Sequence, residues 1–376
     1  MSDDKKFEVM KPNKEKKFLL DPYVDWCEAE GPPIIEDFGI DLFAVETKPW
    51  PRYDAKGAFL HVLGRGDFVS TFLLDLPPGG STAPVHHIFE KTVYVIDGHG
   101  STTIECPDGT THTFEWGPKS LFALPLNATY RHFNGSGRDK ALLACTHDMP
   151  LVMNLFHNEE FVFNNPYRFP ERVGDTKHFD GDGDFTPVRP GMHMWLTNFV
   201  PDLTSFELKT WNSRGAGSSQ MSFVLADGTM HAHSSEIPTA RYKKAHRHGN
   251  GVHIFAVDGS GYSLLWNEGD KDFHHIPWRH GVLYAPPDWM FHQHFNTCEH
   301  PARYLAITIG SRRYPFLSTR RTGAEGAVDL SVKKGGRQIE YEDQDPRIHE
   351  KWLSELKKTG VRSDMGEFVD ETTYAA

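Results

Sequence analysis

The sequence predicts an all-β protein made of two similar domains in tandem, and three observations support this fold class. The chain has 376 residues, which exceeds the usual length of one domain. Its 33 glycines and 25 prolines suit many short strands joined by turns. One pattern of histidines, glycine, proline and asparagine also occurs twice, which is typical of a repeated domain.

The second copy of the pattern places histidines at the spacing of a β-strand. His246 and His248 are separated by one residue, so their side chains face the same side of a strand. An apolar run ends at Gly259, and Pro287 stands seven positions before His294. With His294 on a neighbouring strand, three imidazoles meet in one cavity and can bind a divalent transition metal. The alternative is that these are ordinary surface or core residues of a chain with 22 histidines.

The first copy repeats the spacing but has lost ligands. When the closing glycines of the two copies are aligned, Val85 replaces the first histidine and Lys91 falls at the position of Val252. His87 and His132 remain as ligands of a weaker second metal site. A one-residue bulge would add a further ligand, but a lysine ammonium repels a cation. We therefore expect the first domain to bind metal weakly or not at all.

The repeated pattern resembles the signature of the cupin superfamily: His-x-His, a glycine that closes a hairpin, then proline followed by histidine and asparagine. The resemblance implies two tandem jelly-roll barrels, an arrangement called a bicupin. Together with the strand-like segments, it divides the chain into an N-terminal arm with one short helix (1–55), barrel 1 (56–155), a linker (156–191), barrel 2 (192–311) and a C-terminal extension (312–376).

The three histidines without a carboxylate ligand resemble the metal site of gentisate and salicylate 1,2-dioxygenases. The resemblance implies Fe(II), O2 as co-substrate, and a small aromatic acid or related oxygen-chelating compound whose ring is cleaved. Those enzymes generally keep their active metal in the N-terminal barrel, whereas here the complete set lies in the C-terminal one. A lyase, isomerase or decarboxylase that uses Mn(II), Ni(II) or Zn(II) therefore stays open, as does a non-catalytic binding protein.

Four further residues are candidates for the site. His292 should face the cavity with His294, where it would act as an acid or base or only orient a ligand. The guanidinium of Arg241 matches a substrate carboxylate, and Trp289 would wall an aromatic substrate. Asn296 occupies the buried polar position of the pattern, and we count it among the substrate-binding residues.

Composition excludes several other classes of protein. The net charge of −11 argues against a nucleic-acid partner. The chain has no run of 18 apolar residues that would span a membrane, and its first residues lack the apolar core of a signal peptide. Its four cysteines show no paired spacing, as expected in a reducing compartment. We expect a cytoplasmic homo-oligomer, dimeric or tetrameric, that acts on a small molecule.

One helix is predicted in the C-terminal extension. Asp345 is a suitable N-cap, and Pro346 suits the first helical position. Apolar residues follow at helical spacing, which predicts docking of the helix on the body of the protein; they are Ile348, Trp352, Leu353 and Leu356.

Overall fold

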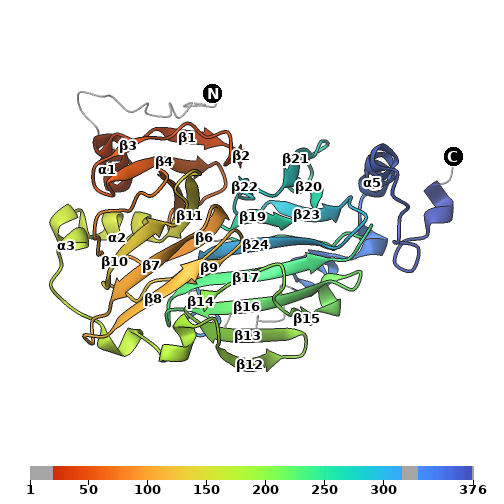
Figure 1. Ribbon diagram of the computed structural model, residues 1–376. Coiled ribbons are helices and arrows are strands. Elements are labelled where there is room, and N and C mark those ends of the chain that lie inside the picture. The colour runs from red at the N-terminus through yellow and green to blue at the C-terminus, as the bar shows by residue number, and fades with distance from the viewer. Residues whose placement is uncertain (1–19, 250, 316–328, 375–376) are drawn as a thin grey trace, which may run out of the picture.

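The computed structural model describes residues 20–249, 251–315 and 329–374. Strands dominate, and they form two sheet pairs that lie side by side (Figure 1). The prediction of an all-β fold with two barrels, an N-terminal arm and a helical C-terminal tail is confirmed. No helix in the described ranges is long and apolar enough to cross a membrane.

The first barrel is built from an eight-stranded and a three-stranded sheet. The larger sheet contains β1 (Ile34–Asp37), β3 (Lys48–Trp50), β4 (Ala55–Val62), β5 (Ser70–Leu76), β6 (Lys91–Asp97), β9 (Leu121–Ala123), β11 (Ala141–His147) and β14 (Phe199–Val200). The smaller sheet contains β7 (Gly100–Glu105), β8 (Thr111–Trp116) and β10 (Thr129–Asn134). Apolar side chains from both sheets, such as Phe72 and Ile104, fill one core between them.

The second barrel repeats this plan with a nine-stranded and a five-stranded sheet. The larger sheet contains β2 (Gly39–Asp41), β12 (Asp184–Arg189), β13 (Met192–Thr197), β15 (Lys209–Thr210), β16 (Ser219–Leu225), β17 (Met230–Ile237), β19 (His253–Asp258), β22 (Val282–Tyr284) and β24 (Ala302–Ile309). The smaller sheet contains β18 (Ala245–His246), β20 (Ser260–Trp266), β21 (His274–Arg279), β23 (Phe291–Asn296) and β25 (Gln338–Ile339).

Each barrel receives a strand from outside its own part of the sequence. Strand β2 of the N-terminal arm pairs with β22 of the second barrel, and β14, which follows the linker, pairs with β9 of the first. The two large sheets contribute to one buried apolar cluster, in which the rings of Tyr94 and Phe255 are 5.5 Å apart. These contacts hold the two barrels together.

Helices lie at the edges of the barrels (Figure 1). Within the described residues, the α-helices are α1 (Pro22–Glu30), α2 (Met149–Phe156), α3 (Glu159–Phe163) and α5 (Pro346–Thr359). Short 3₁₀ turns connect other elements: η1 (Pro170–Arg172), η2 (Thr176–Phe179), η3 (Asn212–Arg214), η5 (Val332–Lys334), η6 (Tyr341–Asp343) and η7 (Glu371–Tyr374).

The C-terminal helix α5 forms as the sequence predicts. The side chain of Asp345 caps its first turn. Ile348, Trp352 and Leu356 are buried, and the Trp352 ring lies 5.9 Å from that of Phe295 in β23. The helix therefore covers the outer face of the strand that carries His292 and His294 on its inner face.

Candidate metal centre

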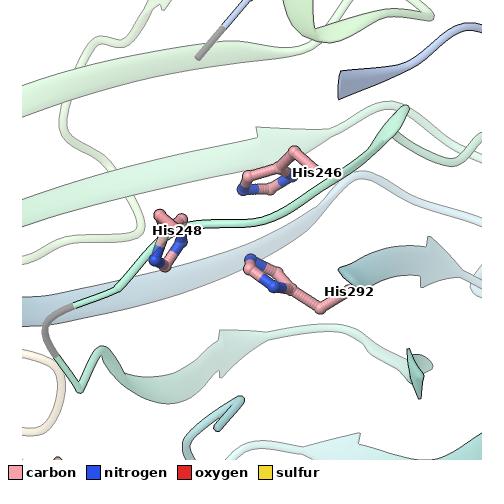
Figure 2. Close-up of side chains that lie close together, drawn as sticks. All are labelled: His246, His248 and His292. Atoms are coloured by element: carbon pink, nitrogen blue, oxygen red, sulfur yellow. The ribbon is translucent and has the colours of Figure 1, made fainter. Parts of the chain in front are cut away.

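Three histidines come together inside the second barrel. His246 lies on β18, His248 follows it, and His292 on β23 is the direct cross-strand partner of His246. One ring nitrogen of each lies within 4.8 Å of those of the other two, and the three rings turn toward a common point (Figure 2). Across the described ranges, no other group of three His, Cys, Asp or Glu side chains is so close.

The hydrogen bonds of these rings leave lone pairs free for a metal. His292 Nδ1 lies 3.2 Å from the carbonyl oxygen of Met290 and donates its proton there, so the buried Nε2, which has no partner, keeps its lone pair. His248 Nδ1 lies 3.3 Å from the carbonyl oxygen of Gly249 in the same way. The buried Nδ1 of His246 has no hydrogen-bond partner. These rings fit a divalent metal ion.

Burial keeps the three imidazoles in the neutral form that binds metal. It lowers the pKa of His248 to about 4, with the nearby Arg214 guanidinium acting in the same direction. It also holds the pKa values of His246 and His292 well below their usual range. A metal can therefore bind at neutral pH without displacing protons from these rings.

His294 lies beside this group and makes different contacts. Its Nδ1 is 2.8 Å from Ser263 Oγ and 3.1 Å from the hydroxyl of Tyr284. Its ring centroid is 6.2 Å from that of His246, whereas that of His292 is only 4.2 Å away. The structure thus brings His292 into the group in place of His294. Alternation predicts that both face the cavity, and the strand register places His292 opposite His246.

Two residues predicted to bind substrate have other partners. Arg241 Nε donates to Asp364 Oδ2 at 2.8 Å, which ties the C-terminal extension to the barrel, and its side chain does not line the cavity around the histidines. Trp289 is 51% exposed and stacks beneath the Arg337 guanidinium at 4.8 Å. Neither residue is placed to contact a substrate at the three histidines.

Asn296 holds the backbone together instead of binding a substrate. Its buried amide nitrogen donates to three backbone carbonyls, those of Ile237, Pro238 and His300. Its Oδ1 accepts from the N–H of Cys298. Asn134 makes the same set of bonds in the first barrel, to Leu76, Pro77, Asp139 and Ser136. Because both copies bond the amide to the same kinds of backbone groups and bury it, this position is structural.

The three histidines line a cavity of about 200 Å³ with a strongly basic wall. Val252 lines it at the position where the resemblance leads us to expect a carboxylate. The wall contains three further histidines (His231, His233 and His294) and five basic side chains (Arg189, Arg214, Lys243, Arg312 and Arg337). In the part of the chain that the structure describes, the wall contains no Asp or Glu. This concentration of positive charge contrasts with the net charge of −11 of the whole chain.

A hydrogen-bonded network fills the equivalent position in the first barrel. Val85 and Tyr130 are cross-strand partners there, as His246 and His292 are in the second. The buried ammonium of Lys91 donates to the Tyr130 hydroxyl at 2.6 Å, and His87 Nε2 lies 3.0 Å from the same oxygen.

The two histidines of the weaker site are engaged elsewhere. His87 Nδ1 bonds to the carbonyl oxygen of Phe89, and His132 Nδ1 bonds to Thr102 Oγ1. Only the buried Nε2 of His132 has no hydrogen-bond partner. No group of three ligand atoms forms around them in the described residues. A weak second metal site at His87 and His132 therefore stays a prediction, and these contacts do not favour it.

Comparison with family models and with curated proteins finds no match. Among solved structures, several of oxalate decarboxylase from Bacillus subtilis are similar. A mutant of that enzyme has a TM-score of 0.47 at 14% identity, covering 80% of this chain and 85% of that one. A structure from work on the enzyme's Mn(II) centres has a TM-score of 0.47 at 13% identity, covering 80% and 86%. Structural similarity with a TM-score below 0.5 gives no information about the site.

Proposed function

We propose that the protein is a metal-dependent enzyme that binds one divalent ion through His246, His248 and His292. The convergence of these three neutral imidazoles at one cavity is the observation that carries this proposal. Three protein ligands leave coordination positions open, which is typical of catalytic and not of structural metal sites. The Nδ1 atoms of His248 and His292 bond to backbone carbonyls, which leaves Nε2 of each ring as the metal-binding nitrogen. This arrangement is typical of metal ligands and supports the same conclusion.

The cavity supports a small organic acid as the substrate. Its wall has five basic side chains and no carboxylate among the described residues. Arg189 and Arg214 pair with Asp329, which does not line the cavity, and the excess of positive charge attracts an anion and repels a cation. A metal held by three neutral ligands keeps its full charge and favours a chelating pair of oxygens. The cavity of about 200 Å³ is smaller than the sites that hold drug-sized ligands, and this favours a small molecule.

Non-oxidative metal-dependent chemistry, meaning a decarboxylase, lyase or isomerase reaction, suits this cavity best. The wall combines apolar surface with many histidine, arginine and hydroxyl side chains, and Arg241 and Trp289, assigned from sequence to an aromatic acid, do not line it. When bound, Mn(II), Ni(II) or Zn(II) supplies a Lewis acid that stabilises negative charge on the substrate. His231 Nε2 and His233 Nδ1 are 3.1 Å apart on the same wall and can hold or move a proton.

A second candidate is an Fe(II)- and O2-dependent dioxygenase acting on a small aromatic acid. One observation favours it: Val252 lines the cavity where a carboxylate ligand would otherwise lie, so all three proposed ligands are neutral. Such a set leaves room for both a chelating substrate and O2.

Metal-substituted protein separates the two candidates. Protein depleted of metal is loaded with Mn(II), Ni(II), Zn(II) or, without oxygen, Fe(II), and is given 2-oxo acids, dicarboxylates and hydroxybenzoates. We expect the protein to transform one of these acids without consuming O2, with the product detected by NMR. Oxygen consumption only with Fe(II) and a hydroxybenzoate would establish the dioxygenase. If no metal binds, or no acid is transformed with any metal, the proposal of a metal-dependent enzyme is overturned.

A further inference from the structure

A buried lysine lies in the same cavity as the three histidines. Lys243 is 2% exposed, and its Nζ donates to the hydroxyl of Tyr304 on β24 at 3.1 Å. Both side chains line the cavity wall. The neighbouring Lys244 instead forms an ion pair with Glu340 outside the cavity. The two adjacent lysines therefore have different environments, and only Lys243 faces the site.

The charge of Lys243 has no carboxylate partner among the described residues. The hydroxyl of Tyr304 engages one of the three N–H groups of the ammonium. By contrast, the buried guanidinium of Arg214 has Asp329 at 3.7 Å. A buried ammonium without a counter-ion is costly unless an anion joins it. Lys91 of the first barrel is equally buried and also donates to a tyrosine hydroxyl, that of Tyr130. There, however, His87 bonds to the same hydroxyl, whereas Lys243 and Tyr304 line the cavity of the three histidines.

His294 and Tyr304 connect the three histidines to the lysine through neighbouring ring contacts. The rings of His292 and His294 are 5.5 Å apart, and those of His294 and Tyr304 are 4.9 Å apart. The backbone N–H of Lys243 also donates to the carbonyl oxygen of His294 at 3.1 Å. The three histidines, His294, Tyr304 and Lys243 all line the same cavity, so one small molecule bound there has both groups in its wall.

Two separate positive centres favour a substrate with two anionic groups. The proposed metal with three neutral ligands binds one chelating group, and this leaves Lys243 uncompensated. We propose that Lys243 and Tyr304 form a second anion subsite, so that the substrate is a small dicarboxylate that chelates the metal at one end and places its other carboxylate against Lys243. This inference rests on the proposed function and names the substrate class of the same site.

The test compares matched acids with two and with one carboxylate. Zn(II)-loaded protein is titrated calorimetrically with malate and with 2-hydroxybutyrate, which share the chelating 2-hydroxy acid group. Tartronate and 2-hydroxyglutarate extend the series to shorter and longer spans. We expect wild type to bind the best dicarboxylate roughly 10- to 100-fold more tightly than its monocarboxylate, as for a charge-assisted hydrogen bond.

Three variants locate the source of this preference. Lys243→Met should abolish it while changing the monocarboxylate affinity by less than about threefold, and Tyr304→Phe should reduce it. Lys244→Met is the matched control and should behave as wild type. A preference that survives in Lys243→Met, or is absent in wild type, would overturn the subsite. Metal content is measured in each sample, because failure to bind Zn(II) would overturn the proposed function and not this subsite alone.

Discussion

The two barrels share their scaffold contacts, although only one of them gathers three histidines. In each barrel a tryptophan N–H donates to a hydroxyl oxygen that also bonds to the Nδ1 of a histidine. The three residues are Trp116, Thr102 and His132 in the first barrel. They are Trp278, Ser263 and His294 in the second. Because the same chain of bonds exists in both barrels, it belongs to the fold. His294 thus belongs to the hydrogen bonds that both barrels share.

The barrels differ at the cross-strand pair that faces the cavity. The second barrel has His246 opposite His292, and the first has Val85 opposite Tyr130. The first barrel also holds the ammonium of Lys91 in this space, and a buried cation there disfavours the binding of a metal ion. A few replacements inside a shared scaffold thus distinguish the proposed metal site from the hydrogen-bonded core of the first barrel.

The largest expected effect is on turnover. His248→Ala removes a proposed metal ligand and should lower kcat/KM by about a thousandfold or more, since the chemistry depends on the metal. Tyr130→Phe in the first barrel should leave kcat/KM within about threefold of wild type. Equal losses in both variants would show that the first barrel takes part in the reaction.

The next effect is on stability and should be the same in both barrels. Asn134→Ala and Asn296→Ala each remove the side-chain bonds to three carbonyls and one N–H, and that N–H is left without a partner. We expect each to lower the free energy of unfolding by roughly 3 kcal/mol or more, measured by urea denaturation. A loss confined to one variant would contradict the equivalence of the two positions.

A smaller effect should depend on pH and arise in the first barrel only. Burial lowers the pKa of Lys91 from 10.5 to about 8. Between these values the unfolded chain binds more protons than the folded one, so wild-type stability rises with pH through this window. Lys91→Met should be more stable than wild type near pH 7, by up to about 3 kcal/mol. The difference should shrink toward pH 10.5, and a constant difference would contradict this pKa.

The sequence predicted the fold and part of the site for identifiable reasons. Alternation fixed the shared face of His246 and His248, and the repeat revealed two barrels. Alternation could not choose between His292 and His294, because both share one face and only the strand register distinguishes them. The partner of Arg241 is Asp364, which is 123 residues away. Lys243 and Tyr304 are 61 residues apart and carry no local pattern.

Metal content after matched substitutions tests the central claim most directly. Asparagine at either position keeps a polar group near Nδ1 and removes Nε2, so His292→Asn and His294→Asn differ only in which ring is lost. Purified folded protein is loaded with Zn(II), dialysed and measured by elemental analysis. We predict about one ion per chain in wild type and in His294→Asn, and almost none in His292→Asn. Metal retained in His292→Asn but lost in His294→Asn would contradict the account.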